Sequence, residues 1–236
     1  FDAPEKEQLV HYRRYDLESF TVGTPDLRSA YVHNLEAGWT RFLPRLGSVS
    51  AELFYRANTD EIQTLTDGIY DPALGRYVQF SRPVNMGSSS LLGGQLNLTY
   101  RPNATLSVRL DGTLFESRYR AQFREGQWVE GDTLSYRLRL SAWVKLWKKV
   151  DLFCNASYAS PTIGLISATG PRKSIDLGLA ADLLAHKLSL TLGVQDLFNW
   201  NAHETSILNP YLTSSATTLL TSRYLTFSLT YRLGRM

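Results

Sequence analysis

Three arginines and one aspartate in the middle of the chain have a spacing that places them on one surface. Arg109 and Asp111 lie two positions apart, as do Arg137 and Arg139, with apolar residues between them. Side chains two positions apart in a β-strand point to the same face. The four residues therefore predict a charged surface that lines a path for a solute or docks another domain. The alternative is a solvated wall with cross-strand charge pairs, each stabilising the sheet by about 0.2–1 kcal/mol.

Residues that commonly catalyse reactions or bind metals are scattered along the sequence. The four histidines have no i, i+4 spacing and form no HExxH motif, and no GxSxG motif occurs. The pairs His203–Glu204 and Asp60–Glu61 have no further partner nearby in the sequence. The single cysteine, Cys154, excludes an internal disulfide and a CxxC site. We therefore expect no catalytic residue, no cofactor, no metal and no enzymatic activity.

Aromatic and amide residues in two predicted loops are candidates for contact with a ligand. Tyr70 and Tyr77 fall in the segment 58–88, and Trp200, Asn201 and Tyr211 fall in the segment 199–221. These residue types suit the binding of glycans or peptides. They equally suit loops that only pack against each other, and both interpretations stay open.

The charged residues must be positioned by regular secondary structure, and the segment 133–147 gives the clearest indication of its type. This segment reads TLSYRLRLSAWVKLW. Its even positions are apolar and its odd positions are polar or cationic, with Trp143 and the terminal Trp147 as the exceptions. This alternation is typical of a β-strand with one apolar face. Ordinary strands contain about five or six residues, whereas a strand tilted through a bilayer needs about 9–11. The segment therefore predicts a membrane-spanning strand.

The same alternation recurs along the chain and predicts about ten strands, the first at about 6–15. The joins between them alternate in length. Short joins fall at 43–47, 101–103, 147–149 and 185–187, and long joins at 58–88, 117–132, 160–172 and 199–221. Outer-membrane barrels have short periplasmic turns and longer extracellular loops. We therefore predict an all-β protein, an antiparallel up-and-down transmembrane β-barrel wall formed by a single region, 1–236, with a periplasmic C-terminus. A soluble β-sandwich is the alternative, but its strands are shorter.

Composition agrees with this prediction. The net charge of +3 is small and the cationic residues are dispersed, so nucleic acid is not an expected partner. Apolar runs are too short for a transmembrane helix. Aromatic residues near the predicted strand ends are expected to form two interfacial belts. One belt comprises Trp39, Phe42, Tyr100, Trp143, Trp147 and Tyr231, and the other comprises Tyr31, Tyr55, Tyr158 and Tyr224.

Several motifs resemble those of a known family. The segment Gly23-Thr-Pro-Asp-Leu27 followed by AYVHNLEAGW, the segment NMGSSSLLGGQLNLTY and the segment VQDLFNW resemble elements of TonB-dependent outer-membrane receptors, especially the Bacteroidetes outer-membrane β-barrel group. The chain departs from the pattern at Thr24, where Asn is usual, and at Gln95, where Glu is common.

The resemblance implies active nutrient uptake across the outer membrane of a Gram-negative bacterium. Such receptors have about 22 strands and an N-terminal plug domain that contacts TonB. This chain is therefore expected to be the C-terminal part of a larger barrel, with plug and TonB as partners through the missing N-terminal part and the lipid bilayer around it. Whether a surface lipoprotein is a further partner stays open. The alternatives are a self-contained small barrel that acts as a passive pore or structural protein and, less favoured, an outer-membrane protease or lipase.

Overall fold

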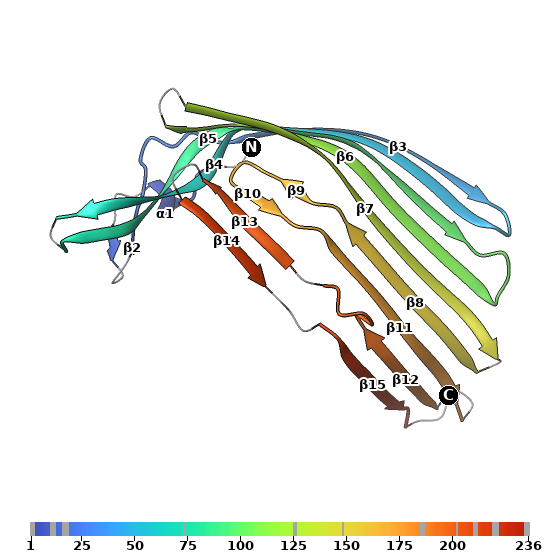
Figure 1. The fold of residues 1–236 in the computed structure, drawn as a ribbon. Helices are drawn as coiled ribbons and strands as arrows, with labels where there is room; N and C mark the ends of the chain where they lie inside the picture. Colours follow the sequence, from blue (N-terminus) through green and yellow to red (C-terminus); the bar gives the residue numbers. More distant parts are fainter. Residues whose placement is uncertain are drawn as a thin grey trace.

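The computed structural model describes residues 3–9, 13–15, 19–72, 74–124, 127–147, 149–184, 187–201, 203–209, 212–218 and 222–233. These residues form an eleven-stranded sheet, in which β1 and β2 are a short appendage and the other nine strands form a curved wall one layer thick (Figure 1). The nine strands are β3 (Tyr31–Leu43), β4 (Gly47–Asp71), β5 (Arg76–Tyr100), β6 (Leu106–Arg124), β7 (Gln127–Trp147), β8 (Val150–Ala159), β11 (Arg172–Leu183), β12 (Leu188–Gln195) and β15 (Tyr224–Tyr231). Neighbouring strands of this wall are antiparallel, and the arch is not closed between β3 and β15. The predicted all-β, antiparallel wall is confirmed.

The pairing register gives the wall one aliphatic face. Leu98 of β5 lies opposite Leu110 of β6, which lies opposite Leu140 of β7. Farther along the wall, Leu179 of β11 lies between Leu152 and Leu192 in the same way. Since alternate residues point to opposite faces, the apolar residues of all nine strands form one continuous surface, called here the aliphatic face. The opposite, polar surface is called the inner face.

The strands extend farther than the sequence pattern predicts. The segments 58–88 and 117–132, predicted as long loops, are mostly the distal halves of the β4–β5 and β6–β7 hairpins. Apolar alternation ends before the strands do, because a strand that leaves an apolar environment still pairs through its backbone. The segments 160–172 and 199–221 also contain strands, β9 (Thr162–Ile163), β10 (Ser167–Thr169), β13 (His203–Asn209) and β14 (Leu212–Thr218). These four form a second sheet in the order β14-β13-β10-β9.

The strand expected at 6–15 is not part of the wall. Lys6–Leu9 form a single helical turn, α1, and β1 (Arg13–Tyr15) pairs with β2 (Ser19–Val22). β2 in turn pairs in parallel with the distal part of β5 at Gln79–Ser81. The described part of the wall therefore has nine strands rather than about ten.

The end of the wall away from the short turns, called here the distal end, bends inwards and closes around a small core. Bulges near Asp60 and Met86 shift the register of β4 against β5, and bulges bend strands. Asp60 has a positive φ of 54° and forms an ion pair with Arg28 at 2.7 Å. Leu65, Met86, Ala121 and Leu165, which come from four separate segments, are buried together. β14 also lies against β4 at this end.

Of the ten residues expected in the aromatic belts, seven lie on the aliphatic face as expected and three do not. The residues on the aliphatic face are Trp39, Tyr100, Trp147 and Tyr231 near the short turns and Tyr31, Tyr55 and Tyr158 toward the distal end. Tyr55 lies opposite Leu92, eight residues from Tyr100 on β5, or about 27 Å along the strand. The other three residues lie on the inner face, because each alternates in register with the polar residues of its strand. They are Phe42, Trp143 and Tyr224.

Trp143 has a packing role on the inner face. Its ring lies 5.2 Å from that of Phe153, centroid to centroid. The Phe153 ring covers Gly178 so closely that a Cβ added there would lie 2.1 Å from Phe153 Cζ. An aromatic ring laid across a neighbouring glycine protects backbone that would otherwise be exposed. No helix in the described ranges is long and apolar enough to cross a membrane.

Candidate functional site

The four charged residues singled out by their spacing come together on the inner face. Arg109 and Asp111 project from β6, and Arg137 and Arg139 project from β7. The register places Asp111 directly opposite Arg139. All four line one hollow of about 770 Å³, called here the arginine hollow. The predicted shared surface therefore exists, and its functional role stays a prediction.

The ion pair within the arginine hollow joins two residues of the same strand rather than residues of neighbouring strands. The Arg109 Nε lies 3.1 Å and 3.2 Å from the two oxygens of Asp111, two residues away on the same strand. The Arg109 side chain is 62% exposed, so this pair adds at most about 1 kcal/mol to stability. The Arg137 guanidinium lies 5.3 Å from the centroid of the Phe115 ring. Arg139 forms no ion pair with any residue that the structure describes.

One further arginine in the hollow was not among the sequence candidates. Arg172, the first residue of β11, lines the same hollow. It lies opposite Ala159 of β8, and Ala159 lies opposite Arg137 of β7. The sequence pattern predicts that residue 172 lies in a long loop, so its position in the hollow follows only from the strand register. Like Arg139, it forms no ion pair within the described ranges.

The predicted ligand-contact residues form two separate groups. Tyr70 and Tyr77 lie opposite each other beside the turn of the β4–β5 hairpin, with their rings 5.5 Å apart, and both are exposed. Trp200 stacks on Phe198 at 4.3 Å in the loop after β12, and Asn201 lines the arginine hollow. Figure 1 shows that the hairpin tip and this loop lie far apart on the wall. Tyr211 lies outside the described residues.

The loop that carries Trp200 is held by a buried aspartate. Asp196 is 1% exposed and has a positive φ of 43°. Its carboxylate accepts backbone hydrogen bonds from Trp200 and Asn201, both at 3.0 Å, and one from the hydroxyl of Ser222. Its own N–H donates to Asp176 Oδ1 at 2.8 Å. Asp196 therefore joins the end of β12 to Ser222, just before β15, and holds the segment 197–201.

The hydrogen bonds to Asp196 affect its ionisation. Burial alone would raise the pKa of this carboxyl, whereas the hydrogen bond from Ser222 lowers it. The two backbone hydrogen bonds and the nearby charge of Arg223 lower it further, so the pKa of Asp196 lies below its ordinary value.

The acidic pair Asp60–Glu61 and the cysteine singled out from the sequence lie apart from each other in the structure. The residues that the structure describes contain no group of three or more His, Cys, Asp or Glu side chains placed to hold a metal ion. Asp60 is paired with Arg28, and Glu61 accepts a hydrogen bond from Ser89. Cys154 lies between Ala142 and Leu177 on the aliphatic face, where it packs as a small apolar residue.

Replacing Asp196 tests its role in holding the loop. An amide at this position has one acceptor oxygen in place of two, so Asp196→Asn leaves a backbone N–H of Trp200 or Asn201 without its acceptor. We expect the opening free energy of the segment 197–201 to fall by about 1–3 kcal/mol at pH 7, measured by hydrogen exchange of these amides. Asp132→Asn, an exposed residue of β7, is the control and should change nothing.

The lowered pKa of Asp196 also sets a pH dependence. The contribution of this carboxylate is complete above the unfolded-state pKa, about 3.9, and is lost as the pH falls through the lower folded-state pKa. Acidification in this range should therefore lower the opening free energy of the segment 197–201 in the native protein, measured by hydrogen exchange corrected for the intrinsic exchange rate at each pH. The same acidification should have less effect in Asp196→Asn. Equal acid sensitivity in both proteins would contradict this role.

Comparison with known proteins agrees with this geometry. A search of curated proteins finds no match to the chain. The sequence profile of the outer membrane protein beta-barrel family matches residues 4–231. This range includes all nine strands of the wall, the arginine hollow and the loop held by Asp196. The chain therefore belongs to the outer membrane protein β-barrel family, and the aliphatic face is the surface that meets lipid.

Proposed function

We propose that the chain forms part of the barrel wall of a TonB-dependent receptor that imports a nutrient across the outer membrane. The open arch is the observation that carries this proposal. β3 pairs only with β4, and β15 pairs only with β12, among the described strands. An unpaired strand edge in lipid leaves backbone groups without hydrogen bonds, at a cost of several kcal/mol each. A larger wall supplies partners for both edges, and the resemblance in sequence to these receptors supports the same conclusion.

The proposed mechanism needs no covalent chemistry from this chain. A ligand is captured at the distal end, and a plug domain inside the barrel is then displaced by an energy-transducing complex that contains TonB. The inner face, which carries the arginine hollow, lines the solute path. Plug and TonB act through a part of the protein N-terminal to this chain, and a surface lipoprotein is a further candidate partner at the distal end.

The proposal also gives the wall an orientation, with the short turns and the C-terminus in the periplasm. Short turns face the periplasm in outer-membrane barrels, and β15 runs toward that end (Figure 1). In a variant without Cys154, we expect Leu74→Cys in the β4–β5 turn to react with a membrane-impermeant maleimide on intact cells. Arg45→Cys in the β3–β4 turn should react only after the outer membrane is permeabilised. The reverse pattern would contradict this orientation.

Binding of TonB tests the proposed function directly. The full-length protein, purified in detergent from its outer membrane, is titrated with the periplasmic domain of TonB. We expect saturable binding that disappears when the plug domain is deleted, because the plug carries the TonB contact. Absence of binding to the full-length protein would overturn the proposal. Steady ion channels in planar bilayers would then indicate a passive pore, and their absence a structural barrel.

A further inference from the structure

The arginine hollow contains more positive charge than the surrounding protein neutralises. Four guanidinium groups line it, from Arg109, Arg137, Arg139 and Arg172, and Asp111 is the one carboxylate among the residues that line it. That carboxylate pairs with Arg109. Arg137, Arg139 and Arg172 form no ion pair within the described residues, and all three are exposed to the solvent inside the arch. Lys173 also lines the hollow, with its ammonium 4.6 Å from the centroid of the Trp200 ring, so the lining has an excess of four positive charges.

The arrangement of the strands concentrates this charge. Arg137 and Arg172 share one register row, with Ala159 of β8 between them. Strands lie about 4.8 Å apart, so the backbones at these two arginines are about 10 Å apart, with Arg139 two residues along β7. A concave surface lined by charges of one sign focuses the electrostatic field and raises the local concentration of counter-ions. Three guanidinium groups can thus reach a single bound molecule.

The size and the remaining lining favour a small solute rather than a macromolecule. The volume of about 770 Å³ lies within the usual range of small-molecule sites, about 300–1,000 Å³. Neutral polar groups make up much of the remaining lining, and some of them already hydrogen-bond one another. The Gln95 Nε2 donates to Asn97 Oδ1 at 3.1 Å, and the hydroxyls of Ser157 and Ser174 are 2.8 Å apart. These groups can orient hydroxyl or amide groups of a solute without competing for its negative charge.

We infer that the arginine hollow binds a small solute with at least two anionic groups, either carboxylates or phosphates, held by Arg137, Arg139 and Arg172. Guanidinium groups bind both kinds of anion through paired, charge-assisted hydrogen bonds. The inference extends the proposed function, since it names the chemical class of the transported solute. Equilibrium binding in the hollow needs neither TonB nor transport, so the two proposals can fail separately.

Isothermal titration calorimetry of the full-length protein in detergent, at about 50 mM salt to limit screening, tests the inference. Pyrophosphate and citrate are the two anionic probes, one for each class, and glycerol is the neutral control. We expect at least one anion to bind with a dissociation constant well below that of glycerol. Whichever anion binds more tightly identifies the class of anionic group.

Paired substitutions assign the binding to the arginine hollow. The double variant Arg139→Gln/Arg172→Gln keeps polar side chains of similar length and should weaken anion binding at least tenfold. Arg118→Gln is the matched control, because Arg118 pairs with Glu116 at 2.9 Å and has the parity of the aliphatic face of β6. It should bind the anion as the native protein does. Heat-dependent gel mobility confirms that each variant is folded.

Three results would overturn the inference. In the first, the native protein binds pyrophosphate and citrate no more tightly than glycerol, which includes the case where carboxylates of another domain fill the hollow. The double variant could bind the anion as tightly as the native protein. Arg118→Gln could lose as much affinity as the double variant, which would indicate attraction by overall charge rather than a site.

Discussion

The register between neighbouring strands is the constraint on which the rest of this structure depends. A slip of one residue would move every side chain of a strand to the opposite face. With the observed register, Leu110 meets Leu98 and Leu140 on one face. The same register brings Asp111 beside Arg139 on the other face, in a hollow that also includes Arg109. One set of backbone hydrogen bonds thus produces both the aliphatic face and the arginine hollow.

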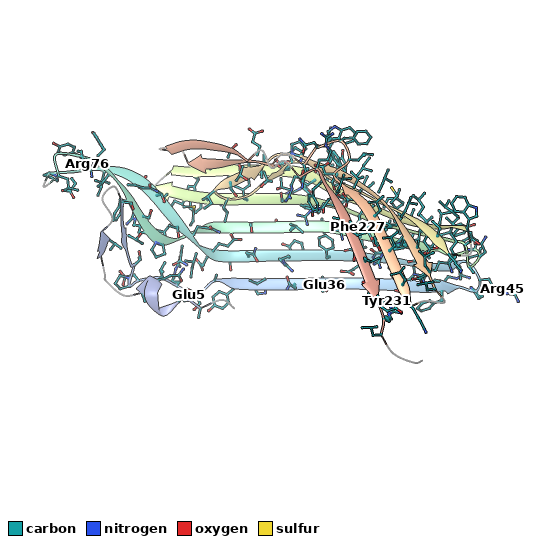
Figure 2. The ribbon with its side chains drawn as sticks, turned by 90° about the horizontal axis from the view of Figure 1, so that it is seen from below. Glu5, Glu36, Arg45, Arg76, Phe227 and Tyr231 are labelled. Carbon is teal, nitrogen blue, oxygen red and sulfur yellow. The ribbon has the colours of Figure 1, made fainter. Side chains whose placement is uncertain are left out.

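The distal end obeys a different constraint, because the alternation of apolar and polar residues ends before it. There the bulges near Asp60 and Met86 turn the β4–β5 hairpin inwards, and Leu65 becomes buried against Leu165. Figure 2 shows this hairpin, with Arg76 at its tip, extending past the ends of the neighbouring strands. The wall therefore changes from an open arch with an aliphatic outer surface to a narrower region with a core of its own.

Sequence pattern alone predicted the wall, its two faces and the grouping of Arg109, Asp111, Arg137 and Arg139, because period-two alternation directly encodes which side chains share a face. It did not predict where strands end, since polar strands beyond the lipid lose the alternation but keep their backbone pairing. Arg172 was missed for that reason. Trp143 was expected in a belt, because tryptophan is common at membrane interfaces. Its position in the strand register and its contact with Phe153 instead place it on the inner face.

Asp196 is a further example of what pattern cannot show. The segment VQDLFNW was recognised only as a resemblance, whereas the structure gives its physical role. The carboxylate accepts hydrogen bonds from Trp200 and Asn201 and ties two strands together through Ser222. The contact with Ser222 joins residues 26 positions apart, which no local spacing reveals.

The most direct test of the account compares two adjacent residues of β11. Leu179 lies in the middle of the aliphatic face and is 42% exposed, whereas Ala180 faces inwards, opposite Asp151. Unfolding free energies are measured for the protein folded into phosphatidylcholine vesicles. We expect Leu179→Arg to lower the unfolding free energy by about 2–4 kcal/mol, as a charge near the bilayer midplane does, and Ala180→Arg to change it by less than about 1 kcal/mol. Equal losses, or a larger loss at Ala180, would contradict the assignment of the two faces.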